Sequence, residues 1–553
     1  MSRLASYRMV VCITAFGLVA SLCVESQSSN ATCAAGTCRI AGTVVSASDG
    51  HPLSRARVIL TNIKDPRSPK SVITEEDGGF LFAGVDASKY SLEALRRGFV
   101  PGGFDQHGSF STAIVTGAGL DTEHLVFRLT PQSYIVGQVL DENSDPVRGA
   151  NVRLYREDRE DGVNHIVPSR PSTTDDLGMY ELGPNSPGTY FVSVQASAWY
   201  AVHPQQSDPN TPRETLPRVD SGLDVAYPVT YYGDETNTDE GVPIQLKGGE
   251  RFRADIHLAP VAALHLLVHV PVVGANVAPA FPRLQQSGLD NEFLPGVQER
   301  IVSPGVWEVT GVPEGNYTID IFDQATGQMR TTQVSATVQG QDVDATGAEP
   351  SAVVNVSVQL PEERSFPSGL YVGLQVPNGM VKSVGEADAK GDAHLQQVPP
   401  GEYRLVGWDG RKRYSVLGLS LGGQSVGGEK IHVDPGATVA VSATLASGLG
   451  SLEGVVKKGT TPVAGAMVVL VPDDPAEHPD FFRRDQSDLD GTFALRSLVP
   501  GKYTVIAIEN GWDLEWSRPD IIASYLARGQ KVAVGDQRRE AIKLADPVQA
   551  QER

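Results

Sequence analysis

The stretch that decides the fold is residues 488–505, which read DLDGTFALRSLVPGKYTV. Asp490-Gly491 is a strong turn pair, because glycine takes positive φ at little cost and aspartate tolerates it. Residues 492–496 then alternate between apolar and small or polar side chains, which is the period-two pattern of a strand with one buried face. A second turn follows at Pro500-Gly501, and Tyr503 restarts the alternation. The stretch therefore predicts a β-hairpin.

The same unit recurs along the chain. Each copy has a turn, a short alternating strand and a closing tyrosine; in the first copy, residues 86–89 replace the Pro-Gly turn. The closing tyrosines lie 86 to 127 residues apart and are Tyr90, Tyr190, Tyr317, Tyr403 and Tyr503. About 100 residues is the length of one small β-sandwich. We therefore predict an all-β chain that is a tandem array of about five β-sandwich modules.

The predicted module boundaries follow this spacing. The modules are expected at 38–130, 131–260, 261–360, 361–446 and 447–546. The second carries a long insertion, roughly 199–241, that is rich in proline, aspartate, threonine and tyrosine. The third and fourth keep mainly the central hairpin and are more degenerate at their starts. A helical segment is expected around residues 521–528, and the residues after Pro547 are expected to fray.

The chain has 553 residues and a formal net charge of −20. An acidic surface argues against a nucleic-acid partner, because phosphate binding needs a basic one. Residues 1–26 are predicted to be a signal peptide, with Arg3 and Arg8 ahead of an apolar run from Met9 to Val24. That run is shorter than the ~20 residues of a spanning helix. We expect an exported protein with no later membrane span, found in the periplasm, on the outer surface or outside the cell. A retained membrane anchor is the alternative.

Two of the four cysteines, Cys12 and Cys23, would leave with the signal peptide. The other two, Cys33 and Cys38, stand just before the first predicted strand. In an oxidising compartment they could close a small loop at the mature N-terminus. No second Cys or His pair accompanies them, so their spacing is not a zinc pattern. A local disulfide is predicted, and two free thiols are the alternative.

Catalytic patterns lack the structural context that they need. The eleven histidines include no His-x-x-Glu pair of the metallocarboxypeptidase kind. Gly-x-Ser-x-Gly occurs twice, around Ser420 and Ser425, but a nucleophile elbow needs a helix after the serine and here another strand is expected. The pattern therefore predicts no catalytic residue.

Metal patterns are equally weak. His265 and His269 lie four apart in an apolar segment and are better explained as one face of a partly buried strand. Asp488 and Asp490 suggest calcium, but no glutamate follows at the position that a calcium loop requires, so turn capping is favoured. We expect no metal and no cofactor.

Aromatic side chains in long loops are the best binding candidates. Their faces can stack on sugar rings or on partner side chains, and nearby acidic or amide groups can bond hydroxyls. The alternative, that they pack against their own sandwiches, is favoured because large aromatics usually serve packing. The candidates are Trp512, Trp516, Trp199, Tyr231 and Tyr232.

Four motifs recur in a fixed order: Gly-x-Val, Pro-hydrophobic-x-Gly-Ala-x-Val, Asp-x-x-Gly-x-Phe/Tyr-x-Leu and Pro-Gly-x-Tyr. This series resembles the carboxypeptidase regulatory-like domain, which implies a transthyretin-like sandwich related to Cna B-type and other carbohydrate-binding-like folds. Modules two and five contain all four motifs, allowing one residue of drift in the hairpin turn, and module one lacks the Pro-Gly. The arrangement also resembles exported bacterial proteins built of such repeats. In the family's namesake the domain is non-catalytic.

These observations predict an exported, non-enzymatic repeat protein with a binding or spacer role at the cell envelope. Carbohydrate, cell wall or another protein is the expected ligand, and linked modules would extend reach and add weak sites. The alternative is an accessory subunit that positions a separately encoded peptidase or polysaccharide-degrading enzyme. An intrinsic hydrolase is a third hypothesis, because catalytic groups can be assembled from scattered residues.

Overall fold

The computed structural model describes residues 36–553, apart from 118, 160–161, 205–219, 273–279, 287, 290–293, 324–326, 362–365, 377–378, 411, 427–429 and 536–540. The predicted signal peptide and Cys33 lie outside the described residues. Within them, strands dominate, and one α-helix is present, α1 (Pro519–Leu526). The prediction of an all-β chain is confirmed, and the expected helical segment lies within two residues of its predicted place.

The strands form five successive groups. The first group has the sheets β4-β1-β8 and β3-β2-β5-β6, with β7 beside β5. Its strands are β1 (Cys38–Ser46), β2 (Arg57–Asn62), β3 (Asp65–Ile73), β4 (Gly79–Val85), β5 (Lys89–Leu95), β6 (Gly102–Gly103), β7 (Ile114–Val115) and β8 (Leu125–Leu129).

The second group has the sheets β11-β10-β14-β16 and β13-β9-β18, with β12, β17 and β19 at their edges. Its elements are β9 (Ser133–Leu140), β10 (Asn151–Asp158), β11 (His165–Pro168), β12 (Ser172–Thr173), β13 (Met179–Asn185), β14 (Gly188–Gln195), β15 (Val225–Ala226), β16 (Thr230–Tyr231), the 3-10 turn η2 (Thr238–Glu240), β17 (Ile244–Leu246), β18 (Arg251–Arg253) and β19 (Ile256–His257). Strand β15 pairs with β20 (Val261–Ala262), which leads into the third group.

The third group has two four-stranded sheets, β23-β24-β21-β27 and β22-β25-β26-β28. Its strands are β21 (Leu264–His269), β22 (Phe281–Gln286), β23 (Gln298–Ser303), β24 (Val306–Val312), β25 (Gly315–Phe322), β26 (Met329–Ala336), β27 (Asp342–Asp344) and β28 (Glu349–Pro350).

In the fourth group, β34 joins both halves into one path, β31-β30-β33-β34-β37-β29-β32. Its strands are β29 (Ala352–Gln359), β30 (Tyr371–Gln375), β31 (Val381–Glu386), β32 (Asp392–Val398), β33 (Gly401–Trp408), β34 (Arg413–Leu421), β35 (Gln424–Val426), β36 (Lys430–Val433) and β37 (Thr438–Ala446).

The fifth group follows the path β39-β38-β46-β43-β40-β41. Its elements are β38 (Gly450–Lys458), β39 (Thr461–Pro462), β40 (Met467–Pro472), the 3-10 turn η3 (Pro479–Phe481), β41 (Arg483–Gln486), β42 (Thr492–Leu498), β43 (Gly501–Glu509), the 3-10 turn η4 (Gly511–Asp513), α1, β44 (Gln530–Val534), β45 (Ile542–Lys543) and β46 (Val548–Glu552).

Each group encloses a hydrophobic cluster, and the third cluster also takes in Val229 and Tyr231 from the insertion of the second group. The fifth group has a second cluster on the other face of its sheet, where Ile522 of α1 and Trp516 cover Met467 and Ile506. Separate clusters are what tandem sandwiches require, because each must bury its own apolar faces. The chain therefore consists of five packing units joined by short connections.

The repeated hairpin is held in the same way in all five groups. The hydroxyl of each closing tyrosine donates to the backbone carbonyl four residues earlier, across the turn that precedes it. The oxygen–oxygen distances are 3.1, 2.8, 2.7, 2.7 and 2.8 Å for Tyr90, Tyr190, Tyr317, Tyr403 and Tyr503. The tyrosine thus fills the core with its ring and satisfies a turn carbonyl with its hydroxyl.

Two predictions about the ends of modules are wrong. Strand β29 was assigned to the end of the third module, yet it pairs with β32 and β37 and packs in the fourth core. The third module therefore ends before Ala352 and not at 360. The residues after Pro547 do not fray, because β46 pairs in parallel with both β38 and β43.

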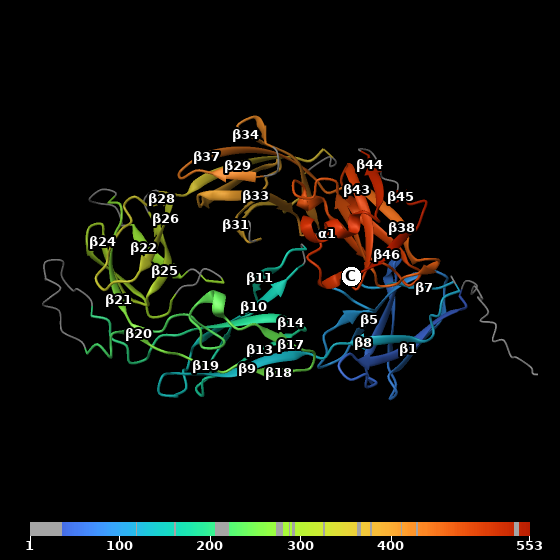
Figure 1. Ribbon diagram of the computed structural model, residues 1–553, viewed down its shortest axis with the longest axis horizontal. Coiled ribbons are helices and arrows are strands. Elements are labelled where there is room, and N and C mark those ends of the chain that lie inside the picture. The colour runs from blue at the N-terminus through green and yellow to red at the C-terminus, as the bar shows by residue number, and fades with distance from the viewer. Residues whose placement is uncertain are drawn as a thin grey trace, which may run out of the picture.

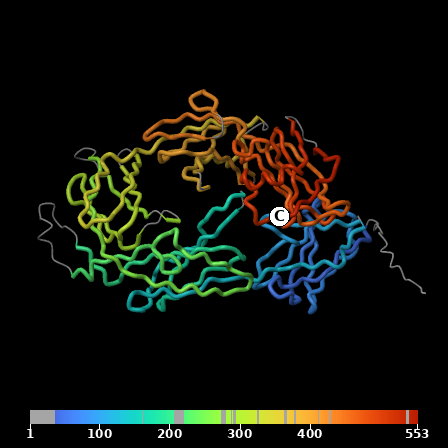
Figure 2. The backbone as a smooth tube through the Cα atoms, viewed as in Figure 1, coloured from blue at the N-terminus to red at the C-terminus, as the bar shows by residue number. Residues whose placement is uncertain are grey.

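The five groups do not run out in a line. Figure 1 shows that they follow a ring-shaped course, with the first group beside the fifth. The tube in Figure 2 traces the same closed course from the blue first group to the red fifth group. The two ends of the array therefore meet, and the expected gain in reach from a linear spacer does not apply.

Candidate binding site at the ring closure

The contact that closes the ring joins β5 and the loop before β7 to the hairpin turn of the fifth group. Lys89 Nζ lies 2.7 Å from Asp488 Oδ2, and Asp488 Oδ1 accepts a hydrogen bond of 3.0 Å from the backbone N–H of Ala113. The backbone N–H of Leu489 donates to Ala113 O at 3.0 Å, and its side chain packs against the first core. Burial raises the pKa of Asp488, while Lys89 and the Ala113 N–H act in the opposite direction.

Gln486 is the polar centre of this contact. It is 2 % exposed, and its Nε2 donates to Asp105 O at 2.6 Å and to Thr112 Oγ1 at 2.7 Å. Its Oε1 lies 3.2 Å from His107 Nδ1. The His107 ring stacks on Trp512 with centroids 4.8 Å apart and planes inclined by 7°. A buried amide with both ends occupied fixes the orientation of the two groups, because misalignment would leave buried polar atoms unpaired.

The second group also touches the fifth. Arg159 Nη1 donates to Asp513 O at 3.2 Å, Asn164 N donates to Glu515 Oε1 at 3.1 Å, and Ser517 N donates to Gly162 O at 3.3 Å. Asp513 and Glu515 follow Trp512 in the loop that leads to α1. One loop of the fifth group therefore contacts both the first and the second group.

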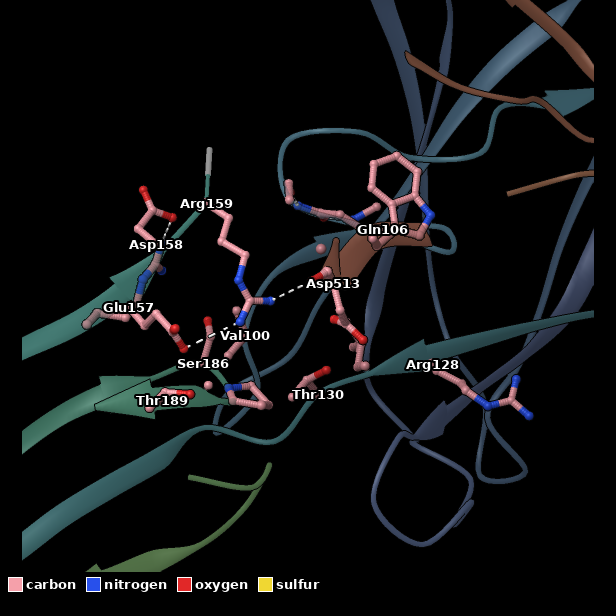
Figure 3. Close-up of a pocket in the computed structure, with 18 of the residues that line it drawn as sticks. Val100, Gln106, Arg128, Thr130, Glu157, Asp158, Arg159, Ser186, Thr189 and Asp513 are labelled. Atoms are coloured by element: carbon pink, nitrogen blue, oxygen red, sulfur yellow. Dashed lines mark hydrogen bonds and ion pairs between the residues drawn. The ribbon is translucent and has the colours of Figure 1, made fainter. Parts of the chain in front are cut away.

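A cavity of about 870 Å³ lies where these three groups meet. Polar and charged side chains line most of it, and Figure 3 shows Arg159 between Glu157 and Asp513. Arg159 Nη2 lies 3.4 Å from Glu157 Oε2, Arg156 Nη2 lies 2.8 Å from Asp158 Oδ1, and Arg553 Nη1 lies 3.2 Å from Asp513 Oδ2. With Arg128, four arginines and three carboxylates line the cavity of a chain whose net charge is −20.

This lining suits a polar ligand. Arginine forks and carboxylates make paired hydrogen bonds with hydroxyl, carboxylate or amide groups. Backbone and side-chain groups of Thr130, Ser186, Thr189 and Gln245 add further donors and acceptors. The cavity size falls in the range of small-molecule sites. The arrangement is suited to binding, and the described side chains that line the cavity include no nucleophile–base pair.

The five aromatic residues predicted to bind a ligand do not lie together on one surface. Trp516 is 6 % exposed and packs against Phe482, and Tyr231 is 3 % exposed within the third core, so both pack in the way that the favoured alternative describes. Tyr232 is half-buried against Phe252. Trp512 lines the cavity, but His107 and Arg484 lie against its ring and its Nε1 donates to Gly465 O at 3.0 Å. These rings fill junctions and cores.

Trp199 differs from the other four. It is 87 % exposed and lies edge-on to Tyr200, with centroids 5.7 Å apart. The Tyr200 hydroxyl donates to Glu142, which also accepts from the Tyr227 hydroxyl at 2.8 Å. Burial and Glu142 raise the pKa of Tyr200 to about 12. Trp199 is therefore a solvent-facing ring that packs against a hydrogen-bonded tyrosine, Tyr200. Its ligand-binding role stays a prediction.

The serine and aspartate motifs are structural. Ser420 and Ser425 face each other as a pair on the β34–β35 hairpin, and the next described element is strand β36, where a nucleophile elbow would need a helix. Asp490 Oδ1 accepts from Thr492 N at 3.0 Å, as a turn-capping aspartate does. The Asp488 carboxylate instead contacts Lys89 Nζ and the backbone N–H of Ala113, outside its own turn. Within the described part of the chain, the two aspartates belong to no group of three acidic, histidine or cysteine side chains close enough to share a metal ion.

A group of metal-ligating side chains lies elsewhere, where the second and third groups join. His203 Nδ1 is 2.9 Å from Asp224 Oδ1, and His265 Nε2 is 2.8 Å from Asp224 Oδ2. Burial raises the pKa of Asp224, but the two imidazoles outweigh it and lower that pKa to about 2. His269 does not join them and pairs with Asp342 at 3.2 Å. By sequence, His265 is a candidate ligand only together with His269, because no spacing rule connects it with His203 or Asp224, which lie in the insertion of the second module.

Cys38 is disulfide-bonded and 2 % exposed. The other three cysteines, including its predicted partner Cys33, lie outside the described residues. The pairing of Cys33 with Cys38 stays a prediction.

Among the described residues, α1 is far too short to cross a membrane, and no other helix has the length and apolar character to do so.

Comparison with known families gives one match. The sequence model of the carboxypeptidase regulatory-like domain matches residues 39–122. The match therefore covers the first group, whose hairpin lacks the Pro-Gly turn, and not the second or fifth, whose motifs are more complete. The suspected resemblance is confirmed for this segment.

No curated protein matches the sequence. Among solved structures, the Bacillus anthracis TIE protein is similar at 12 % identity and a TM-score of 0.17, covering 73 % of each chain. GBS52, the minor pilin of Streptococcus agalactiae, is 12 % identical with a TM-score of 0.21, covering 43 % of this chain and 100 % of its own. BcpA, the major pilin subunit of Bacillus cereus, is 8 % identical with a TM-score of 0.14, covering 73 % and 99 %. At such TM-scores these likenesses carry no argument about function.

Proposed function

We propose that this chain is an exported, non-catalytic β-sandwich protein that binds a polar ligand of the cell envelope in the cavity at its ring closure. The observation that carries the proposal is that the fifth group, from the far end of the array, meets the first and second groups around one cavity of about 870 Å³. The contacts through Gln486 and Asp488 hold the walls of this cavity in place. Preformed walls favour binding, because little order must be gained when the ligand enters.

The lining favours a glycan or a peptidoglycan fragment. Such ligands carry many hydroxyl, amide and carboxylate groups, and the cavity presents arginine, carboxylate, amide and hydroxyl side chains to them. Four arginines on an acidic protein favour a ligand that carries some negative charge. A binding role is favoured over a spacer role, because a closed ring does not extend reach.

The test is a binding screen of the full chain against envelope glycans and soluble peptidoglycan fragments. Arg156, which lines the cavity and is 45 % exposed, is replaced in the variant Arg156→Met. The matched control is Arg251→Met, because Arg251 is equally paired, with Glu181 at 2.7 Å, and does not line the cavity. Saturable binding that Arg156→Met weakens and Arg251→Met leaves unchanged is expected.

Three other outcomes would contradict the proposal. Saturable binding that Arg156→Met does not affect would place the ligand elsewhere. Co-purification with a single enzyme, with no ligand of its own, would favour the accessory role. Turnover by the purified chain that Ser420→Ala or Ser425→Ala abolishes would show that the protein is an enzyme.

A further inference from the structure

The side chains of His203, Asp224 and His265 meet at the junction of the second and third groups. One donor atom from each lies within 4.8 Å of the other two. The side chains of His203 and His265 are 6 % and 9 % exposed, and that of Asp224 is 17 % exposed. Two imidazole nitrogens and a carboxylate, withdrawn from solvent, form a donor set that transition metals bind.

The backbone holds two of these residues in place independently of their side chains. The pairing of β15 with β20 sets Asp224 beside Ala263, whose N–H donates to Asp224 O at 2.9 Å. His265 N donates to Gln339 Oε1 at 2.6 Å, and Gly340 N donates to His265 O at 3.0 Å. Asp224 and His265 therefore lie on neighbouring segments with their side chains directed to one point.

Gly311 orients the third residue. Its φ is +75°, and a Cβ there would lie 2.8 Å from His203 Nε2. The absence of that Cβ lets the His203 ring pack against the β24 backbone with its Nε2 edge. The other nitrogen, Nδ1, faces Asp224. His203 is thus presented through Nδ1 and His265 through Nε2.

The His265 nitrogen is not satisfied as a hydrogen-bonding group. Its Nε2 is buried and lies 2.8 Å from Asp224 Oδ2, yet it makes no hydrogen bond of proper geometry there. A buried polar atom without a partner costs about 1–3 kcal/mol. A cation that accepts the nitrogen lone pair removes this cost, which a simple bridging carboxylate does not.

We propose that His203 Nδ1, the Asp224 carboxylate and His265 Nε2 bind one divalent transition-metal ion, with zinc the ion that the donors favour. Imidazole nitrogens suit zinc, copper, iron and nickel, whereas magnesium and calcium prefer all-oxygen sites. His203 Nδ1 and His265 Nε2 lie 2.9 and 2.8 Å from the two Asp224 oxygens, and one donor atom from each residue lies within 4.8 Å of the other two. A tetrahedral zinc site needs donor atoms about 3.3 Å apart, so side-chain adjustments without a backbone rearrangement would form it. Water takes the fourth position. The ion joins the second and third groups and stiffens the ring.

The experiment uses the full chain, freed of metal with a chelator and dialysed. Zinc is titrated in by calorimetry, and cobalt is added separately to read the tetrahedral absorption bands of a nitrogen–oxygen site. One ion per chain and a higher melting temperature with zinc are expected, because an ion that binds only the folded state stabilises it. Failure of the wild-type chain to take up a stoichiometric ion would overturn the proposal and leave the cluster as a hydrogen-bonded junction.

Variants locate the site. Asp224→Asn and His265→Gln are each expected to weaken zinc binding at least about 100-fold and to remove the zinc-dependent rise in melting temperature. The matched control is His269→Gln, four residues along the same strand, whose exposed side chain pairs with Asp342. Zinc binding that survives both Asp224→Asn and His265→Gln, or that His269→Gln removes, would place the ion elsewhere. Circular dichroism of each variant separates loss of binding from loss of fold.

Discussion

Lys89 and Asp488 form an ion pair of 2.7 Å between residues separated by 399 positions in the sequence. Asp488 lies in the fifth group's copy of the recurring turn. In this copy Asp490 caps the turn by accepting from Thr492 N, so the Asp488 carboxylate can bond outside the turn. In the second group, Asp175 caps the turn itself by accepting from Leu177 N and Met179 N. In the fifth group Asp490 caps the turn, and the side chain of Asp488 instead forms one of the contacts that close the ring.

Replacing Gln486 with leucine should open the ring. The change removes three contacts to the first group and takes away the donor that Gln486 Nε2 offers to Thr112 Oγ1, in a residue that is 1 % exposed. The change should weaken the association of the first and fifth groups by about 1–3 kcal/mol, while the free energy of unfolding of each core stays unchanged. Small-angle scattering should show a larger radius of gyration and longer maximum distance than for the wild-type chain.

Gln245→Leu is the control for this experiment. Gln245 is exposed, and among the described residues its side chain bonds with Thr189 inside the second group. Its removal should leave the scattering curve unchanged. A compact Gln486→Leu chain would show that the remaining contacts close the ring by themselves.

Much of the fold could be predicted from the sequence. The turn pairs, the alternation after them and the closing tyrosines are local patterns, and local patterns report strands and turns directly. The boundary between the third and fourth modules was predicted at residue 360 but lies before Ala352. The reason is physical: β29 alternates like any closing strand, and only its pairing with β32 and β37 assigns it to the fourth core. Likewise, the sequence of residues 548–552 has no local pattern that indicates their parallel pairing with β38 and β43.

The candidate sites could not be predicted in this way. The ring closure and the His203–Asp224–His265 group depend on how whole sandwiches meet, and no spacing rule covers that. The burial of Trp516 shows the same limit, because its loop looks polar in sequence while α1 and Phe482 cover the ring. What the sequence could offer was residue types suited to binding, without the partners that decide their roles.

The buried carboxyl of Asp485 should make stability fall as pH rises. Burial raises the pKa of Asp485 from 3.8 to about 6, against backbone hydrogen bonds from Ala494 and Gln486. Between about pH 4 and 6 the folded chain then holds more protons than the unfolded one, so the free energy of unfolding decreases toward neutral pH and levels off above it. Asp485→Asn should remove this decrease and gain about 1–3 kcal/mol at pH 7.5 relative to pH 4. Denaturant unfolding at both pH values measures it.

Asp520→Asn serves as the control of opposite sign. The Arg518 guanidinium lowers the pKa of Asp520, an exposed carboxyl, so its contribution is present above the unfolded pKa and lost as the pH falls. The variant should lose stability at neutral pH and not gain it. If Asp485→Asn showed the same trend as Asp520→Asn, burial would not govern Asp485.

The closing tyrosines should differ in what their hydroxyls contribute. Tyr503→Phe keeps the ring but leaves the Val499 carbonyl, in a residue 1 % exposed, without its donor at 2.8 Å. The expected loss is about 1–2 kcal/mol of unfolding free energy. Tyr90→Phe removes a longer bond of 3.1 Å in the copy without a proline turn, and should cost less. Equal losses in thermal unfolding would contradict this ranking, and no loss in either variant would contradict a contribution from the hydrogen bond to the turn carbonyl.

The five predicted aromatic residues divide by burial, and two substitutions should separate packing from binding. Trp516→Ala empties the space between Phe482 and α1 and removes the ring under Arg484, so about 3–5 kcal/mol of stability should be lost. Trp199→Ala removes a ring that is 87 % exposed, so stability should change by no more than about 0.5 kcal/mol. If Trp199 binds sugar, the same variant should lose saturable binding to a glycan while its melting temperature stays fixed. Binding that survives Trp199→Ala would leave the cavity at the ring closure to account for it alone.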